Sequence, residues 1–291
     1  MLNALCFDID DLAYGLHMKC GSALPSQYLV EKESYGLLEF LDALDIKATM
    51  FVPGYVAELF PALVKAMADA GHEIGSHGHR HIDAGGLQRK EFRKEVVISK
   101  EMLEDITSQE VSVYKDPCWG ITPRTPWAYD ELIEAGYSVD NTAQPSLLKF
   151  LGYSPDEMIP FRYKGRLTVI PVTSIKLLGK TMPLNGGLFT AYVPIDTQIK
   201  YYRRLNKKGI PFNYYCHPYE LNPQGNNRYF WKRGSLRAGF YGLYFGKYGQ
   251  YITLLSVEFK LGPMKDAYKD FIGPQSKHQG AEYPSSLAAA L

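Results

Sequence analysis

Residues 72–81 read His-Glu-Ile-Gly-Ser-His-Gly-His-Arg-His and place three histidines within five residues, at the end of a short strand-like run. The stretch Asp8-Ile9-Asp10-Asp11 supplies carboxylates, and Tyr215-Cys216-His217-Pro218 supplies a further imidazole. Two imidazoles and one carboxylate form a three-ligand site for a zinc-like divalent ion, which leaves one coordination position open. Histidine-rich loops and Asp-rich turns also occur in proteins that bind nothing. The positions of these residues along the chain decide between the two interpretations.

The chain between these groups alternates between strand-like and helix-like patterns. Residues 3–9 form an apolar run of strand length that ends beside the first acidic cluster, and residues 48–52 form a second such run. Further strands are predicted at 73–75, 111–114, 137–139, 167–172 and 212–216, and helices at 37–44, 56–67, 92–106, 127–133 and 199–205. Strands that alternate with helices predict parallel βα units.

In folds built from parallel βα units, functional groups gather beyond the C-terminal ends of the strands. Five polar residues of this chain fall at or just past a predicted strand end: Asp8, His77, Lys115, Asp140 and His217. Scattered polar residues rarely do so by accident. The pattern therefore favours a single site that combines metal ligands with groups for proton transfer.

These motifs resemble those of the polysaccharide deacetylases of carbohydrate esterase family 4, the NodB homology domain, whose members remove N-acetyl or O-acetyl groups from sugars. Asp8 with Asp10 or Asp11 resembles the first motif, and residues 72–81 resemble the second, which is the most specific. The stretches 183–187, Pro-Leu-Asn-Gly-Gly, and 217–220, His-Pro-Tyr-Glu, resemble a subgroup found in exopolysaccharide gene clusters. The resemblance spans about residues 2–260.

The resemblance implies an α/β fold, namely a distorted and incomplete (β/α) barrel of about seven parallel strands that is related to the TIM barrel. We expect one catalytic domain over residues 1–275, with an aromatic C-terminal helical cap at about 228–272. The aromatic and basic side chains of the cap leave a sugar-stacking platform or a pyrophosphate site open as an alternative. Residues 276–291 are expected to form a flexible tail, part of it derived from a vector.

The resemblance also implies a role for each site residue. His77 and His81 would bind the metal together with Asp10, with Asp11 as the alternative ligand. Zinc is the expected metal, with cobalt or nickel as alternatives. Asp8 would be the general base toward the attacking water. The remaining acid–base residue, His217, would protonate the departing amine.

The chain departs from the family pattern at two motifs. Lys115 stands where the family has an arginine that orients the catalytic aspartate, and lysine lacks the bidentate fork of arginine. Either Lys115 makes a single-point contact with Asp8, or the alignment differs locally. The fourth motif is reduced to residues 139–142, which leaves open whether Asp140 supports His217. The residues expected to line the substrate site are Pro117, Cys118, Trp119, Asp140, Asn185, Gly186, Gly187 and Tyr215.

Composition agrees with an ordinary enzyme domain. The 291 residues are 46% hydrophobic, which suffices for one large α/β domain, and the net charge of +1 gives no general attraction to nucleic acid. No run reaches the length of a membrane span, and the N-terminus shows no signal peptide, so we expect a cytoplasmic location. The expected partner is a sugar, an oligosaccharide or a carrier-linked sugar, and the sequence does not indicate an oligomeric state.

The sequence therefore predicts a metal-dependent hydrolase that removes an acetyl group from an N-acetylated sugar in bacterial surface polysaccharide biosynthesis. One alternative is a hydrolase of another carbon–nitrogen bond, such as a ring amide or a formamide. The other is an inactive homologue that binds carbohydrate. The presence of both proton-transfer groups, Asp8 and His217, favours an enzyme.

Overall fold

The computed structural model describes residues 1–12, 14, 28–150, 159–177, 179–186, 193–221 and 247–272. The strands of its main sheet are β1 (Leu2–Asp8), β2 (Thr49–Val52), β3 (Glu73–Ser76), β4 (Val113–Tyr114), β5 (Val139–Asp140), β6 (Phe161–Tyr163), β7 (Leu167–Val169), β10 (Asn213–Cys216) and β11 (Lys260–Gly262). A separate antiparallel hairpin consists of β8 (Ser174–Leu177) and β9 (Lys180–Pro183). The hairpin, β6 and β11 were not predicted from the sequence.

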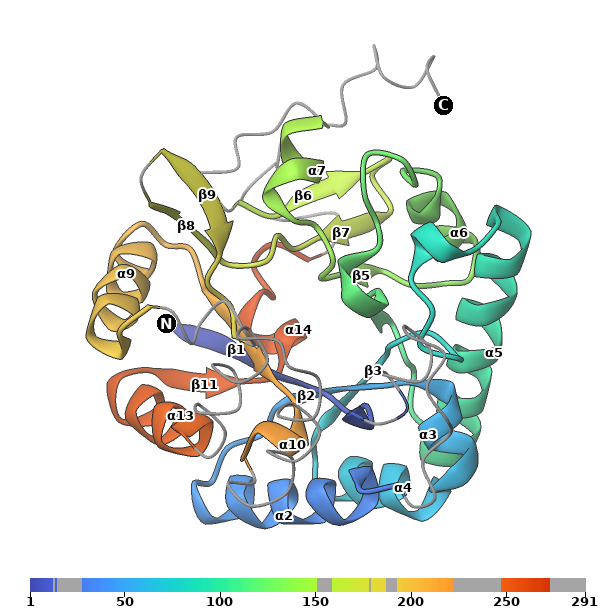
Figure 1. The fold of residues 1–291 in the computed structure, drawn as a ribbon, viewed down its shortest axis with the longest axis horizontal. Helices are drawn as coiled ribbons and strands as arrows, with labels where there is room; N and C mark the ends of the chain where they lie inside the picture. Colours follow the sequence, from blue (N-terminus) through green and yellow to red (C-terminus); the bar gives the residue numbers. More distant parts are fainter. Residues whose placement is uncertain are drawn as a thin grey trace, which may run out of the picture.

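The main sheet has the strand order β10-β1-β2-β3-β4-β5-β7-β6, and β11 pairs with the first residues of β1 on the side away from β10. Every strand pair in it is parallel except β6–β7. Figure 1 shows the sheet curled, with helices arranged around its outside. This arrangement confirms the predicted incomplete (β/α) barrel, to which β6 adds an antiparallel edge.

The longer helices are α2 (Val30–Ala43), α4 (Pro61–Asp69), α5 (Arg89–Thr107), α6 (Ala128–Glu134), α9 (Ile195–Lys207) and α13 (Lys247–Glu258). Short helices are α3 (Gly54–Leu59), α7 (Pro145–Phe150), α10 (Pro218–Leu221) and α14 (Met264–Ala267). The single helix predicted at 56–67 is two helices that meet at Phe60. Proline has no backbone N–H and is favoured in the first turn of a helix, so Pro61 ends one helix and begins the next.

Strand β1 separates two apolar clusters, because successive side chains of a strand point to opposite faces of the sheet. Leu5 and Phe7 lie in the large cluster beneath the surrounding helices. Ala4 and Cys6 lie in a smaller cluster inside the barrel, together with Phe51. Asp8 is two residues beyond Cys6, and the same alternation therefore directs it toward the barrel interior.

The C-terminal segment fills one end of the barrel. Met264 and Tyr268 belong to the interior cluster, and the Met264 backbone N–H donates to Thr49 Oγ1 at 2.8 Å. Strand β11 places Lys260 opposite Leu2 of β1. The predicted helical cap therefore contains a strand of the sheet over its last part, while its residues 228–246 and the predicted tail at 276–291 lie outside the described residues.

Side-chain hydrogen bonds join the chain after β7 to strand β10, where the described sheet does not close by strand pairing. Asn213 Oδ1 accepts from the Thr173 backbone N–H at 3.1 Å, and Asn213 Nδ2 donates to the Pro171 carbonyl at 2.8 Å. The Asn213 backbone N–H donates to Thr173 Oγ1 at 2.8 Å. These bonds hold residues 171–173, which follow β7, against β10.

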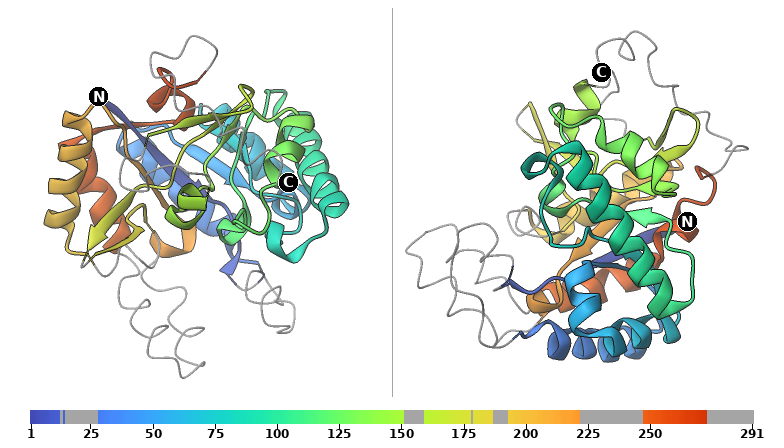
Figure 2. Two further views of the ribbon diagram at one scale, coloured as in Figure 1. Left: turned by 90° about the horizontal axis from the view of Figure 1, so that it is seen from above. Right: turned by 90° about the vertical axis from the view of Figure 1, so that its right-hand side faces the viewer.

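Figure 2 shows the layered arrangement from two further sides, with α9 and α13 along one flank and α5 along the other. Within the described ranges we find no helix with the length and hydropathy that a membrane span requires.

Candidate active site

Polar side chains converge at the C-terminal ends of neighbouring strands. Asp8 is the last residue of β1, His77 directly follows β3, and Lys115 directly follows β4. His217 follows β10, which is the neighbour of β1 on its other side. The structure thus brings together four residues that lie far apart in the sequence, as their predicted strand-end positions indicated.

Asp8 and Lys115 form a buried ion pair. Lys115 Nζ lies 2.7 Å from Asp8 Oδ1 and 2.5 Å from Asp8 Oδ2. Lys115 is 1% exposed and Asp8 is 4% exposed. The ammonium also lies 3.5 Å from the centre of the Tyr215 ring, which is a cation–π contact. Lys115 therefore occupies the place next to Asp8 that the motif indicated, and one nitrogen serves both carboxylate oxygens.

His77 and His81 lie next to each other, with ring centres 5.0 Å apart. His77 Nδ1 is 2.7 Å from the Lys115 carbonyl, and that contact fixes the ring with Nε2 directed toward Asp8, 3.8 Å from Oδ2. Burial outweighs the nearby carboxylate of Asp8 and lowers the pKa of His77 to about 4. The ring is therefore neutral at neutral pH, which is the form that binds metal ions.

Asp10 faces two histidines. Its Oδ2 lies 3.0 Å from His81 Nε2, and its Oδ1 lies 3.8 Å from His217 Nε2. Burial disfavours the charged carboxylate, but His217 and His81 outweigh burial and hold the pKa of Asp10 well below its usual range. Among the described residues, Asp10 Oδ1 is a buried oxygen without a hydrogen-bond partner.

Asp11 has a different environment from Asp10. Its Oδ2 accepts from the backbone N–H groups of Leu29 at 2.7 Å and Val30 at 3.2 Å, at the start of α2. Its Oδ1 accepts from the Tyr14 backbone N–H at 3.2 Å. A carboxylate at this position satisfies unpaired amides and interacts favourably with the helix dipole. Asp11 thus holds the start of α2 against the end of β1.

His217 is held by Glu220, a residue to which sequence reasoning gave no role. Glu220 Oε2 lies 3.0 Å from His217 Nδ1 and accepts from the His217 backbone N–H at 2.7 Å. Burial lowers the pKa of His217, but Asp10, Glu220 and Asp8 outweigh it and raise the pKa to about 9. Tyr219 stacks on the imidazole with ring centres 4.7 Å apart. The signal was present in the sequence as His-Pro-Tyr-Glu, with histidine and carboxylate three residues apart.

The structure does not bring Asp140 to His217. Asp140 is fully buried, and its Oδ1 and Oδ2 accept from the Thr142 hydroxyl at 2.6 Å and the Thr142 backbone N–H at 2.9 Å. Burial outweighs these hydrogen bonds and raises the pKa of Asp140 to about 7. The described residues thus show no contact of Asp140 with His217, a support that the sequence left open, because the carboxyl group faces its own loop. The substrate contact of Asp140 stays a prediction.

The loop after β4 has an unusual backbone. Cys118 and Trp119, in the short 3-10 turn Pro117–Trp119, have φ angles of 54° and 55°. Non-glycine residues in this region are uncommon and cluster at functional sites. The Trp119 ring packs edge-on against the Tyr215 ring, with ring centres 5.6 Å apart. The structure thus places this loop beside the Asp8–Lys115 pair.

Asn185 and Gly186 lie along the edge of β10 that does not face β1. The Tyr215 backbone N–H donates to the Asn185 carbonyl at 2.5 Å, and Gly186 forms a parallel bridge with Tyr215. A Cβ atom on Gly186 would lie 1.5 Å from the Tyr215 carbonyl oxygen, and its φ is +119°. Only glycine fits this approach. Gly187, predicted alongside it, lies outside the described residues.

Comparison with known proteins agrees with this arrangement. A family model described as polysaccharide deacetylase matches residues 28–137, and one described as a domain of unknown function (DUF3473) matches residues 144–241. A solved structure from Mycobacterium smegmatis, assigned as a polysaccharide deacetylase, aligns with a TM-score of 0.59 at 20% identity, covering 92% of this chain and 88% of that chain. Residues 28–137 of the chain are thus similar to the polysaccharide deacetylase family, and the solved structure has the same fold.

Two curated deacetylases show sequence similarity over a shorter region. The peptidoglycan deacetylase of Helicobacter pylori is 29% identical over 106 residues, which are 36% of this chain and 35% of that protein. The peptidoglycan-N-acetylglucosamine deacetylase of Bacillus cereus is 31% identical over 81 residues, 28% of this chain and 30% of that protein. The chain thus matches about a third of the length of these relatives.

The site contains the donor types that a divalent ion requires. Neutral His77, the imidazole of His81 and the ionised carboxylate of Asp10 suit zinc, and the contact of His77 Nδ1 with a carbonyl is a typical outer-shell support. The unpartnered Asp10 Oδ1 also fits a cation. As placed, no three His, Cys, Asp or Glu side chains of the described residues could hold a metal ion.

Proposed function

We propose that the protein is a metal-dependent hydrolase that removes the acetyl group from the nitrogen of an N-acetylated sugar. The observation that supports this most is the convergence of a carboxylate and an imidazole, each with its own charged partner, beside candidate metal ligands. Lys115 faces Asp8 at 2.5–2.7 Å, and Glu220 faces His217 at 3.0 Å. A base and an acid that are each held by a charged partner suit a reaction that needs both.

In this proposal Asp10, His77 and His81 hold the divalent cation, and zinc suits the donor set. When bound, the cation supplies Lewis-acid polarisation of the acyl carbonyl and lowers the pKa of a water molecule. Asp10 is preferred to Asp11 as the carboxylate ligand, because both oxygens of Asp11 already accept backbone N–H groups. Occupancy by cobalt or nickel stays an alternative.

Asp8 is the proposed general base. One of its carboxylate oxygens takes a proton from the attacking water, while Lys115 balances the carboxylate charge in a site from which bulk water is largely excluded. Lys115 also fixes the orientation of the carboxylate through its contact with both oxygens. The backbone amide that follows Pro117 is the proposed donor to the developing oxyanion.

His217 is the proposed general acid. Its Nε2 is the proposed proton donor to the departing amine nitrogen, and the neighbouring Glu220 carboxylate favours the protonated imidazole and raises its pKa. Glu220 stays hydrogen-bonded to Nδ1 and holds the ring while that proton leaves. The neighbouring Tyr219 ring limits rotation of the imidazole. Water thus adds one oxygen to the acetyl carbon, and the amine leaves with the proton from His217.

We also propose a sugar of a bacterial surface polysaccharide, free, oligomeric or carrier-linked, as the substrate. Supporting this are the peptidoglycan names of the relatives and the resemblance of residues 183–187 and 217–220 to the exopolysaccharide subgroup. The cytoplasmic location stays a prediction from the sequence.

The test is acetate release from N-acetylated monosaccharides, nucleotide sugars and oligosaccharides by chelator-treated protein, before and after zinc or cobalt is added. We expect activity only with metal and its loss in Asp8→Asn, while the metal content of that variant stays unchanged. Asp69→Asn, the same change on the exposed face of α4, is the matched control. Near-normal activity of Asp8→Asn, or activity of the metal-free protein, would contradict the proposal.

A further inference from the structure

A cavity lies on the flank of the barrel, between the β8–β9 hairpin and α9. Its volume is about 360 Å³, which is within the range of small-molecule sites. Its lining residues are Ser174, Ile175, Lys176, Tyr201, Arg204, Leu205 and Lys208. None of the residues named for the candidate active site belongs to this group, so the cavity is a separate feature.

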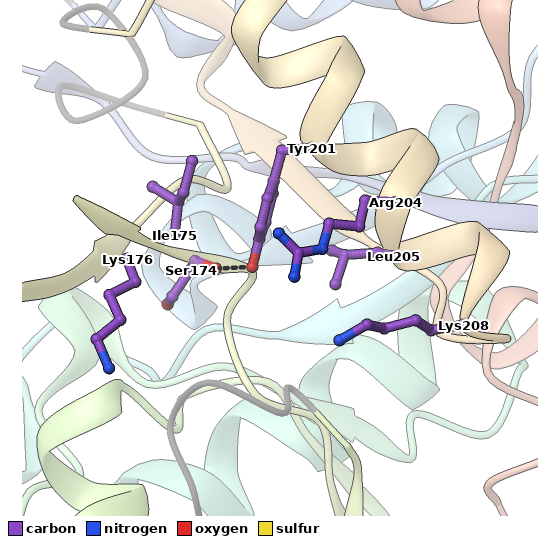
Figure 3. Close-up of a pocket in the computed structure, with 7 residues that line it drawn as sticks. All are labelled: Ser174, Ile175, Lys176, Tyr201, Arg204, Leu205 and Lys208. Carbon is purple, nitrogen blue, oxygen red and sulfur yellow. Dashed lines mark hydrogen bonds between the residues drawn. The ribbon is translucent and has the colours of Figure 1, made fainter.

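The lining combines an apolar floor with a cationic rim. Ile175 and Leu205 are 7% and 4% exposed. Figure 3 shows Arg204 and Lys208 extending from α9 and its C-terminal end toward the side where Lys176 extends from β8. Among the described residues that line the cavity, three are basic and none is acidic.

Two of the cations lie at the C-terminal end of α9. Arg204 is in the last turn of the helix, and Lys208 is its C-cap. Within the described part of the chain, neither of them forms an ion pair, whereas the adjacent Arg203 pairs with Glu258 of α13. The charged side chains of this helix that face the cavity are thus the ones left for an outside partner.

Two hydroxyl groups fix the walls of the cavity to each other. Tyr201 donates to the Ser174 carbonyl at 2.5 Å, and Tyr202 donates to the Leu184 carbonyl at 2.6 Å. These bonds tie α9 to the residue that begins β8 and to the residue that follows β9. The cavity is therefore shaped before a ligand arrives, which reduces the ordering cost of binding.

We infer that this cavity is an anion-binding site for a phosphate-bearing ligand, with a pyrophosphate group as the best match in charge. A pyrophosphate brings several negative charges to three cations, whereas a single carboxylate brings one. Arginine binds phosphate through two parallel N–H donors, and lysine adds a mobile point charge. The ligand is either a soluble phosphate compound or the headgroup of a lipid.

The competing explanation is that the basic residues only stabilise the C-terminal end of α9. Cations in the last turn interact favourably with the helix dipole, and Arg204 and Lys207 both lie there. Lys200 and Lys207 are exposed on the same helix but do not line the cavity. Lys200→Gln/Lys207→Gln therefore removes the same charge from α9 as Arg204→Gln/Lys208→Gln without changing the site.

The experiment measures calorimetric binding of pyrophosphate to the full chain and co-sedimentation with vesicles of phosphatidylcholine, with and without phosphatidic acid. We expect one site for pyrophosphate or selective binding to the phosphatidic acid vesicles, and the two arms distinguish a soluble ligand from a headgroup. Arg204→Gln/Lys208→Gln should weaken binding about 100-fold, since each charge-assisted contact contributes about tenfold or more. The control variant should change it less than about 3-fold.

Two results would overturn the inference. One is the absence of binding in both arms with folded wild-type protein. The other is an equal loss of binding in the cavity variant and in the control variant, which would reduce the effect to general charge. Unfolding midpoints of both variants establish that they are folded before binding is compared.

Discussion

Replacing Lys115 by methionine tests whether the Asp8–Lys115 pair organises the barrel interior. Methionine has a similar length and leaves the apolar contacts of the side chain largely in place, but it removes the charge. Asp8 then stays 4% exposed without its counter-ion. Removal of one partner from a buried ion pair costs about 3–5 kcal/mol, out of a total stability of about 5–15 kcal/mol. We expect a loss within that range for Lys115→Met.

The assay is guanidinium chloride unfolding of chelator-treated protein, so that metal binding does not add to the stability of either form. A double-mutant cycle with Asp8→Asn isolates the interaction, and we expect a coupling free energy of at least about 2 kcal/mol. Lys65→Met removes the lysine of an exposed pair with Asp69 and should cost less than about 1 kcal/mol. Equal losses for Lys115→Met and Lys65→Met, or a coupling near zero, would refute the reasoning.

Three further predictions concern single residues. Glu220→Gln should lower kcat by about 10- to 100-fold with metal content unchanged, because His217 loses the carboxylate at 3.0 Å; unchanged kcat in the acetate assay would contradict this. Burial lowers the pKa of His72 to about 4 in the folded protein. As the pH falls from 6.5 to 4, this histidine therefore takes up a proton only in the unfolded chain, and the free energy of unfolding should decrease across that window. His72→Asn should flatten the decrease in urea titrations. Gly186→Ala should destabilise the protein by more than about 1 kcal/mol in the same titrations, because the new Cβ meets the Tyr215 carbonyl, and a neutral effect would show that the loop moves aside.

Local patterns in the sequence were sufficient for the framework of the barrel. The apolar run before Asp8 predicted β1, and the period-two alternation of a strand then directs Asp8 inward. The elements that were not predicted, β6, β8, β9 and β11, are three or four residues long. Such strands have too few residues for periodicity to distinguish them from loops, and their pairing depends on distant segments.

The choice among neighbouring acidic residues depended on the tertiary structure. Asp10 and Asp11 are adjacent and chemically identical, yet one faces His81 and the other accepts amides at the start of α2. Residues beyond the end of a strand no longer follow its alternation, so their directions are set by what packs around them. The same applies to Glu220, which holds His217, whereas Asp140 bonds to Thr142 of its own loop.

The sequence by itself determined the parallel βα order and the delivery of Asp8, His77, Lys115 and His217 to strand ends, because both follow from contacts within short stretches of chain. Only the tertiary structure decided which of these groups meet. The Asp8–Lys115 pair joins residues 107 positions apart, and its distances depend on the curling of the whole sheet. The flank cavity likewise exists because a hairpin and a helix are packed together, which no local pattern specifies.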